Sequence, residues 1–76
     1  MNIEKIKALF NQKGEVHFKL YSLEYTIIKE NDEILVYADL YATRKQNYKT
    51  IEDALNYFTV YNESLIENEN RIINII

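Results

Sequence analysis

Hydrophobic and polar positions follow two different periods along the chain, and each period predicts one kind of element. Between Ile3 and Phe10, apolar residues recur every three or four positions, the spacing of one face of an amphipathic helix. Gly14 is the only glycine, and it follows this stretch where a helix often ends in a left-handed residue. The pattern therefore predicts a helix over residues 2–13, capped by Asn2 and ended by Gly14 at positive φ.

An alternating pattern follows and predicts strands. Residues 16–21 alternate between apolar and polar, the period of a half-buried strand. Residues 25–29 and 34–38 are rich in β-branched and aromatic side chains and predict two further strands. We expect a tight connection at Ser22-Leu23 and a turn over residues 30–33, because Asn and Asp tolerate the left-handed conformation.

The register of the second hairpin follows from the length of its loop. A two-residue loop places Glu30 opposite Glu33, and the two like charges repel. A three-residue loop instead pairs Lys29 with Glu33 and Tyr25 with Tyr37. The second register is therefore preferred here, and it matters because a one-residue slip exchanges the buried side chains of a strand.

The second half of the chain predicts a polar connection and then helices. Residues 42–49 form the connection, and the segment around Tyr48 is expected to add a short edge strand. Thr50 opens a helix, since Asp53 stands three residues later in a variant of the capping box. Asn62 is expected to cap a last helix that carries Leu65, Ile66, Ile72, Ile73 and Ile76. A strand over residues 72–76 is the alternative, given their β-branched content.

These elements predict an α+β fold. The order is α-β-β-β-α-α with an optional fourth strand, which indicates a small two-layer domain with helices on one face of an antiparallel sheet. A length of 76 residues permits a single globular domain, residues 1–76. No apolar run is long enough to span a bilayer, so no membrane association is expected.

The composition argues against most catalytic and cofactor sites. One His, one Gly and no Cys cannot supply a zinc site or a glycine-rich phosphate loop. His17 is expected to face away from the core, with no orienting partner nearby in sequence. We therefore expect no catalytic residue, no metal site and no cofactor, and thus no enzyme. An enzyme whose site is completed by another chain stays an alternative.

Tyrosine is the strongest signal for a binding surface. The chain has seven, and this residue is enriched at interfaces because its ring is buried while its hydroxyl stays wet. Packing in a small core explains them equally well. The densest positive charge lies beside one of them, and the combined candidate binding residues are Arg44, Lys45, Tyr48, Lys49, Tyr25 and Tyr37.

The leading interpretation is a non-enzymatic protein-interaction module with an unidentified protein partner. A net charge of −3 makes nucleic acid unlikely as a partner, so weak nucleic-acid binding through residues 44–49 and the sheet tyrosines is the alternative. The four C-terminal isoleucines must be buried on the sheet or in a homodimer. The absence of Cys favours the cytoplasm, and the many residues with AT-rich codons favour a bacterial or phage source.

Overall fold

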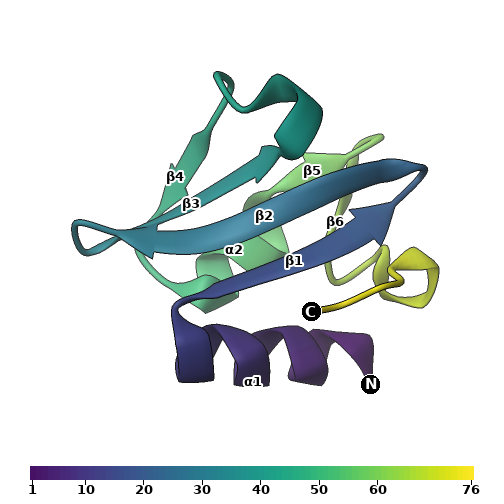
Figure 1. The fold of residues 1–76 in the computed structure, drawn as a ribbon. Helices are drawn as coiled ribbons and strands as arrows, with labels where there is room; N and C mark the ends of the chain where they lie inside the picture. The colour runs from purple at the N-terminus through teal and green to yellow at the C-terminus, as the bar shows by residue number, and fades with distance from the viewer.

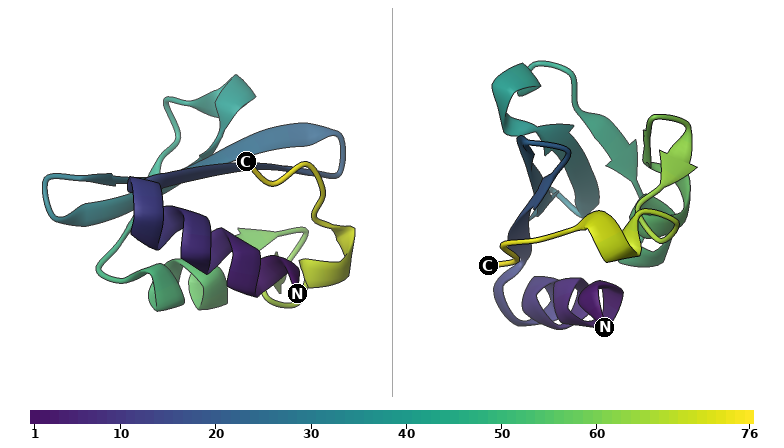
Figure 2. Two further views of the ribbon diagram at one scale, coloured as in Figure 1. Left: turned by 60° about the horizontal axis from the view of Figure 1, so that its bottom comes forward. Right: turned by 90° about the vertical axis from the view of Figure 1, so that its right-hand side faces the viewer.

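The computed structural model describes residues 1–76 and confirms the α+β architecture. Four strands form one antiparallel sheet in the order β1-β2-β3-β4, and both α-helices lie against the same face of it (Figures 1 and 2). The elements are α1 (Asn2–Lys13), β1 (Glu15–Leu20), β2 (Leu23–Glu30), β3 (Glu33–Ala38), the 3-10 turn η1 (Asp39–Tyr41), β4 (Gln46–Tyr48), α2 (Ile51–Tyr57), β5 (Thr59–Val60), β6 (Glu63–Ser64) and the 3-10 turn η2 (Glu69–Arg71).

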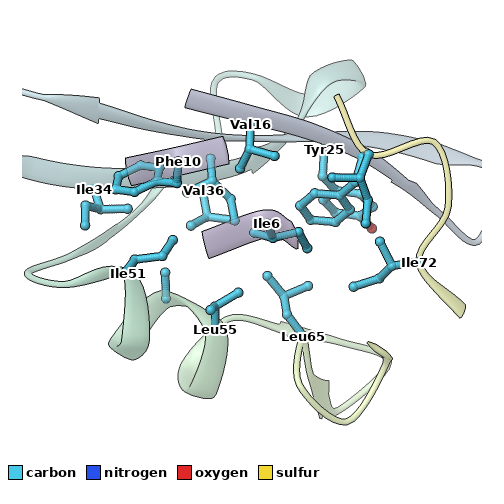
Figure 3. Packing of buried hydrophobic residues seen from close by; sticks show 14 of the residues in the cluster. Ile6, Phe10, Val16, Tyr25, Ile34, Val36, Ile51, Leu55, Leu65 and Ile72 are labelled. Carbon is cyan, nitrogen blue, oxygen red and sulfur yellow. The ribbon is translucent and has the colours of Figure 1, made fainter. Parts of the chain in front are cut away.

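The core fills the space between the sheet and the helices. Alternate residues of β1 point inward, as their sequence pattern predicts, and Val16, Phe18 and Leu20 are all buried. Figure 3 shows Ile6 of α1 and Leu55 of α2 meeting the inner face of the sheet from below. The predicted edge strand at Tyr48 is confirmed as β4. The predicted start of α2 is also confirmed, because the Thr50 hydroxyl accepts a hydrogen bond from the Asp53 amide at 3.0 Å.

Gly14 ends α1 in the left-handed conformation, as predicted. Its φ is 76°, and its amide donates to the Phe10 carbonyl at 2.7 Å. The predicted cap at the other end was wrong, because Asn2 lies inside the helix and Met1 precedes it. The Asn2 side chain instead donates to the Glu69 and Ile72 carbonyls, both at 2.9 Å. The start of α1 is thus fastened to the C-terminal segment.

The substitution Gly14→Ala should lower the free energy of unfolding by about 1 kcal/mol, because an L-residue pays a steric penalty at positive φ. A Cβ added at this position meets nothing within 4 Å, so the backbone alone accounts for the loss. Denaturant unfolding measures it, and Gly14→Asn should recover part of the loss because Asn tolerates this conformation. Equal stability of the alanine variant and the wild type would contradict the assignment.

The predicted three-residue loop between β2 and β3 was wrong. Glu30 stands opposite Glu33, Lys29 opposite Ile34 and Tyr25 opposite Ala38. The loop consists of Asn31 and Asp32 alone, both at positive φ, and a turn of this kind matches the twist of the two strands. Glu30 and Glu33 are exposed, so water screens their repulsion, and the register keeps Ile34 and Val36 in the core.

Three hairpins use the same kind of turn. In each, two non-glycine residues at positive φ join the strands, as type I′ geometry requires. The pairs are Tyr21-Ser22, Asn31-Asp32 and Tyr61-Asn62. The expected connection at Ser22-Leu23 is therefore displaced by one residue, and Leu23 is already the first residue of β2.

The last predicted helix was also wrong. Asn62 lies in a turn rather than at a helix cap, and the residues that follow it form β6, η2 and an extended tail. The tail runs along the free edge of β1 (Figures 1 and 2), where His17 exchanges backbone hydrogen bonds with Ile76, and Lys19 with Ile73. One extra residue on the tail side forms a bulge with Asn74 at a φ of 55°.

This bulge decides which isoleucines are buried. Strict alternation would send residues three positions apart to opposite faces of a strand. Because the bulge adds a residue, Ile72 and Ile75 both point into the core, while Ile73 and Ile76 are exposed. The extended alternative for residues 72–76 thus describes the tail better than the helix did.

Candidate functional site

An aromatic groove opens at one end of the fold, between the inner face of the sheet and the β5–β6 hairpin. The segments that line it are the β1–β2 turn, the end of β3 with η1, and β5, which lie toward the same end of the molecule (Figure 1). Its volume is about 310 Å³. We call it the tyrosine groove, and its principal lining residues are Tyr21, Tyr25, Tyr41, Tyr61, Phe58 and Arg44.

Two of these tyrosines sit at the first position of a type I′ turn. Tyr21 has a φ of 51° and Tyr61 a φ of 53°, and their rings meet edge to face with centroids 4.9 Å apart. Asn, Asp or Gly usually occupies such positions, because a larger side chain clashes there with its own backbone. Both turns therefore carry a tyrosine at a position where a smaller residue would strain the backbone less.

Tyr25 forms the floor of the tyrosine groove and is only 5 % exposed. Its ring stacks on Phe18 at 5.5 Å and meets the edge of Phe58 at 6.0 Å. In Figure 3 it lies at the end of the core near Ile72. No protein group bonds its hydroxyl, and no fully buried polar side-chain atom lacks a partner. The hydroxyl of Tyr25 must therefore reach the solvent of the groove.

Asn68 holds the wall of the groove in place. It is 0 % exposed, and its amide nitrogen donates to the carbonyls of Glu63 at 3.1 Å and Ser64 at 3.0 Å. Its carbonyl oxygen accepts from the Tyr21 hydroxyl at 2.8 Å. One buried amide thus ties the β5–β6 hairpin to the β1–β2 turn, the two segments whose tyrosines meet. The sequence offered no signal for this role, because the partners of Asn68 come from segments far apart in the chain.

Arg44 is the only charged residue in the lining of the tyrosine groove. Its guanidinium lies 5.9 Å from the centroid of the Tyr41 ring, a cation–π contact. No carboxylate lies within ion-pair distance of it, whereas Arg71 near the same end is 3.6 Å from Glu63. The groove therefore combines an aromatic lining with one uncompensated positive charge.

Burial raises the pKa of the Tyr25 phenol above its usual value, and the neighbouring Tyr61 phenol adds to the shift. The phenol has a pKa of about 10 in the unfolded chain and a higher pKa in the folded protein. Its contribution to the free energy of unfolding is therefore complete below a pH of about 10, and it is lost as the pH rises through the folded-state pKa. The Tyr25 hydroxyl is therefore a neutral hydrogen-bond donor at neutral pH.

The variant Tyr25→Phe should flatten the loss of stability at high pH. Above a pH of about 10, the Tyr25 phenol of the wild type ionises when the chain unfolds, and this ionisation favours the unfolded state. The variant has no such group at this position. Denaturant unfolding of both proteins between neutral pH and pH about 11 measures the difference. Tyr57→Phe, which alters an exposed phenol, should follow the wild type. Parallel pH profiles for Tyr25→Phe and the wild type would refute the expectation.

The candidate binding residues from the sequence are divided over three places. Tyr25 and Arg44 come together in the tyrosine groove. Lys45 instead lies over the Tyr37 ring at 5.1 Å, and Tyr37 points to the face of the sheet opposite the helices. The remaining two, Tyr48 and Lys49, line a separate hollow beside α2.

That second hollow has a volume of about 350 Å³ and a more polar lining. Glu33, Lys49 and Asp53 are its charged lining residues, and Asn47 donates to Glu33 at 2.8 Å. Burial raises the pKa of the Tyr48 phenol, which keeps that group neutral as well. Two carboxylates and one lysine leave this hollow with a net negative charge, and only two of its six lining residues are aromatic.

His17 faces outward from the sheet, as predicted, but it has partners that the sequence did not reveal. Its Nε2 lies 2.7 Å from the Glu15 carboxylate and its Nδ1 lies 3.0 Å from the Thr26 hydroxyl. Thr26 donates its proton to Asp39 at 2.6 Å and is buried. This hydroxyl is therefore not oriented as a nucleophile toward His17. The network instead fastens η1, which carries Tyr41, to β2.

Sequence reasoning missed Tyr21, Tyr41, Tyr61 and Phe58 as members of one site. A usable signal was present in Leu20-Tyr21-Ser22-Leu23 and in Val60-Tyr61-Asn62-Glu63. Both segments place a tyrosine and a small polar residue between positions that continue as strands, the pattern of a two-residue hairpin turn.

The structure gathers no group of three His, Asp or Glu side chains that could hold a metal ion. None of its helices has the length and apolar character needed to cross a membrane. A search of protein-family models, curated proteins and solved structures found no match to the chain. Function is therefore inferred from the tyrosine groove.

Proposed function

We propose that the protein is a small, non-enzymatic interaction module that binds a peptide segment of a partner protein in the tyrosine groove. One observation carries this proposal: Tyr21 and Tyr61 occupy left-handed turn positions, and their rings meet at the groove. The left-handed region costs an L-residue about 1–2 kcal/mol, and strain of this kind is characteristic of functional sites. Two tyrosines held in a strained backbone conformation at the groove support a binding role for their rings.

The character of the lining supports a peptide as the ligand. Tyrosine provides a large, rigid contact area at a low cost in side-chain entropy, together with a hydroxyl that bonds polar backbone groups. The volume of about 310 Å³ suits a few side chains of a bound segment. The residues of the proposed site are Tyr21, Tyr25, Tyr41, Tyr61, Phe58 and Arg44.

Nucleic-acid binding is the competing function. The tyrosines and Arg44 could stack on bases, as in proteins that bind single strands. Such binding also needs several cations along one groove to neutralise phosphates. Here Arg44, Lys45 and Lys49 lie in three different places, and the net charge is −3. We therefore expect no micromolar binding of a labelled oligonucleotide at moderate salt, measured by fluorescence anisotropy.

The proposal can be tested by selecting ligands from a displayed library of random peptides. Peptides enriched on the wild type should lose binding to Tyr61→Asn and to Tyr41→Ser, and should keep it with Tyr57→Ser. Tyr57 is a matched control because its exposure, 69 %, is close to the 77 % of Tyr61, yet it lies outside the groove. Tyr61→Asn should leave the unfolding midpoint near that of the wild type, since Asn suits the turn.

Two results would count against the proposal. The first is a library that yields only peptides whose binding ignores Tyr61 and Tyr41. The second is a loss of binding in Tyr57→Ser equal to that in the groove variants.

The absence of Cys supports placing this module in the cytoplasm, where a domain cannot rely on disulfides. A homodimer is a further part of the proposal, supported by Ile73 and Ile76, which are exposed beside the outer edge of β1. Sedimentation of the wild type and of Ile73→Ser with Ile76→Ser tests it. A monomeric wild type would remove the homodimer and leave the groove proposal unaffected.

A further inference from the structure

We propose that the segment bound in the tyrosine groove is proline-rich, adopts the polyproline II conformation and carries an acidic residue beside its prolines. This inference rests on the proposed function, since it names the class of peptide that the groove takes. Three features of the groove lead to it: an unpartnered hydroxyl at the floor, aromatic walls without a usable strand edge, and a single free cation at the rim.

The first feature is the Tyr25 hydroxyl. Tyr25 is 5 % exposed and its hydroxyl has no partner within the protein, so a donor points from the floor into the groove. The hydroxyls of Tyr41 and Tyr61 are likewise unbonded within the protein, whereas that of Tyr21 donates to Asn68 at 2.8 Å. Three free donors at one site call for a ligand with free acceptors.

The second feature is the absence of a strand edge long enough to extend a sheet into the groove. β5 has two residues, and its Val60 already pairs with Glu63 in the hairpin. A ligand added as a β-strand would find few backbone partners there. A polyproline II segment needs none, because its carbonyls have no internal bonds and its proline rings pack on aromatic faces. Its free carbonyls match the free phenols of the groove.

The third feature is Arg44. It is exposed, stands over Tyr41 at 5.9 Å and has no carboxylate within ion-pair distance, whereas Glu63 lies 3.6 Å from Arg71. In a protein of net charge −3, an unmatched cation at the rim of an aromatic groove favours a ligand with a negative charge at that point. A bidentate bond from the guanidinium to a carboxylate supplies the match.

The ligand lies outside these 76 residues. The chain contains no proline, so none of its own segments can occupy the tyrosine groove in this way.

Three labelled peptides and one oligonucleotide test the inference by fluorescence anisotropy. The first peptide has about six prolines flanked by Asp at both ends, and about 3.1 Å per residue gives it a span of about 25 Å. The second replaces each Asp by Lys, and the third keeps each Asp but replaces the prolines by Gly and Ser. The oligonucleotide is a short thymidine strand.

We expect the Asp-flanked proline peptide to bind at least about tenfold more tightly than either of the other peptides. Arg44→Gln should abolish its advantage over the Lys-flanked peptide, while Lys49→Gln should preserve that advantage. Tyr25→Phe should weaken binding by about three- to tenfold through the loss of one hydroxyl. Tyr57→Phe should have no effect. The unfolding midpoints of all variants show whether the fold is retained.

Several outcomes would overturn the inference. Equal binding of the Gly/Ser and proline peptides would show that the groove does not select polyproline II. Equal binding of the Asp- and Lys-flanked peptides would remove the role of Arg44. A third outcome is that none of the three peptides binds, while peptides selected from the library bind through Tyr61 and contain no proline. This outcome would refute the inference and leave the proposed function standing. Tight binding of the thymidine strand through Arg44 would overturn both.

Discussion

Deletion of residues 72–76 should leave a chain that is largely unfolded at room temperature. The tail buries Ile72 and Ile75, each contributing about 1.5–3 kcal/mol. It also makes four backbone hydrogen bonds to His17 and Lys19, with lengths of 2.8 to 3.0 Å. A domain of this size has only about 3–5 kcal/mol of stability to lose, so the deletion should remove most of it. Denaturant unfolding followed by circular dichroism measures the effect.

A matched pair of double variants separates packing from strand pairing. The double variant Ile72→Ala with Ile75→Ala creates cavities in the core, and it should lower the free energy of unfolding by about 4 kcal/mol or more. Ile73→Ala with Ile76→Ala alters the same segment at exposed positions and should cost less than about 1 kcal/mol. If both pairs, or the deletion itself, leave the midpoint unchanged, the tail does not pack as described.

The second large effect is expected from Asn68→Asp. The substitution nearly preserves shape but replaces a buried amide donor by a carboxylate that faces the Glu63 and Ser64 carbonyls. One carboxylate oxygen keeps the contacts with Tyr21 and with Arg71, 3.4 Å away, but the other takes the place of the amide donor and repels both carbonyls. The loss of these donated bonds at a buried position should cost about 2–3 kcal/mol. The bond from the Tyr21 hydroxyl, 2.8 Å long, should be kept because a carboxylate oxygen also accepts it, so the loss falls on the side of the β5–β6 hairpin.

Asn70→Asp is the matched control for this experiment. It makes the same chemical change two residues away at an exposed position, so it should alter stability by no more than about 0.5 kcal/mol. Thermal or denaturant unfolding of both variants gives the comparison. Equal losses would mean that net charge, and not the buried amide network, determines the result.

Local signals in the sequence predicted the first helix, the three long strands and the start of α2. Each depends on neighbours in the chain: the apolar spacing before Gly14, the alternation in β1 and the cap formed by Thr50 and Asp53. The hairpin register was wrong because like-charge repulsion was given more weight than turn geometry. At the exposed ends of strands, Glu30 and Glu33 interact weakly through water, and the Asn31-Asp32 turn decides the register.

The C-terminal segment could not be predicted in the same way. Its apolar residues fit a helix in part, but its stability comes from pairing with β1, more than fifty positions earlier in the chain. The bulge at Asn74 also breaks the alternation that identifies a strand. The tyrosine groove was hidden for a related reason, because Tyr21 and Tyr61 are distant in sequence. Their rings meet in a fold in which the buried Asn68 side chain joins their two turns.

The most direct test of the central claim is chemical-shift mapping of the labelled protein with a peptide selected from the displayed library. The account predicts saturable shifts in the aromatic signals of Tyr21, Tyr25, Tyr41 and Tyr61, with Tyr57 and the outward-facing Tyr37 unchanged. Shifts confined to Tyr37, Tyr48 or Tyr57, with the signals of the tyrosine groove unmoved, would contradict it.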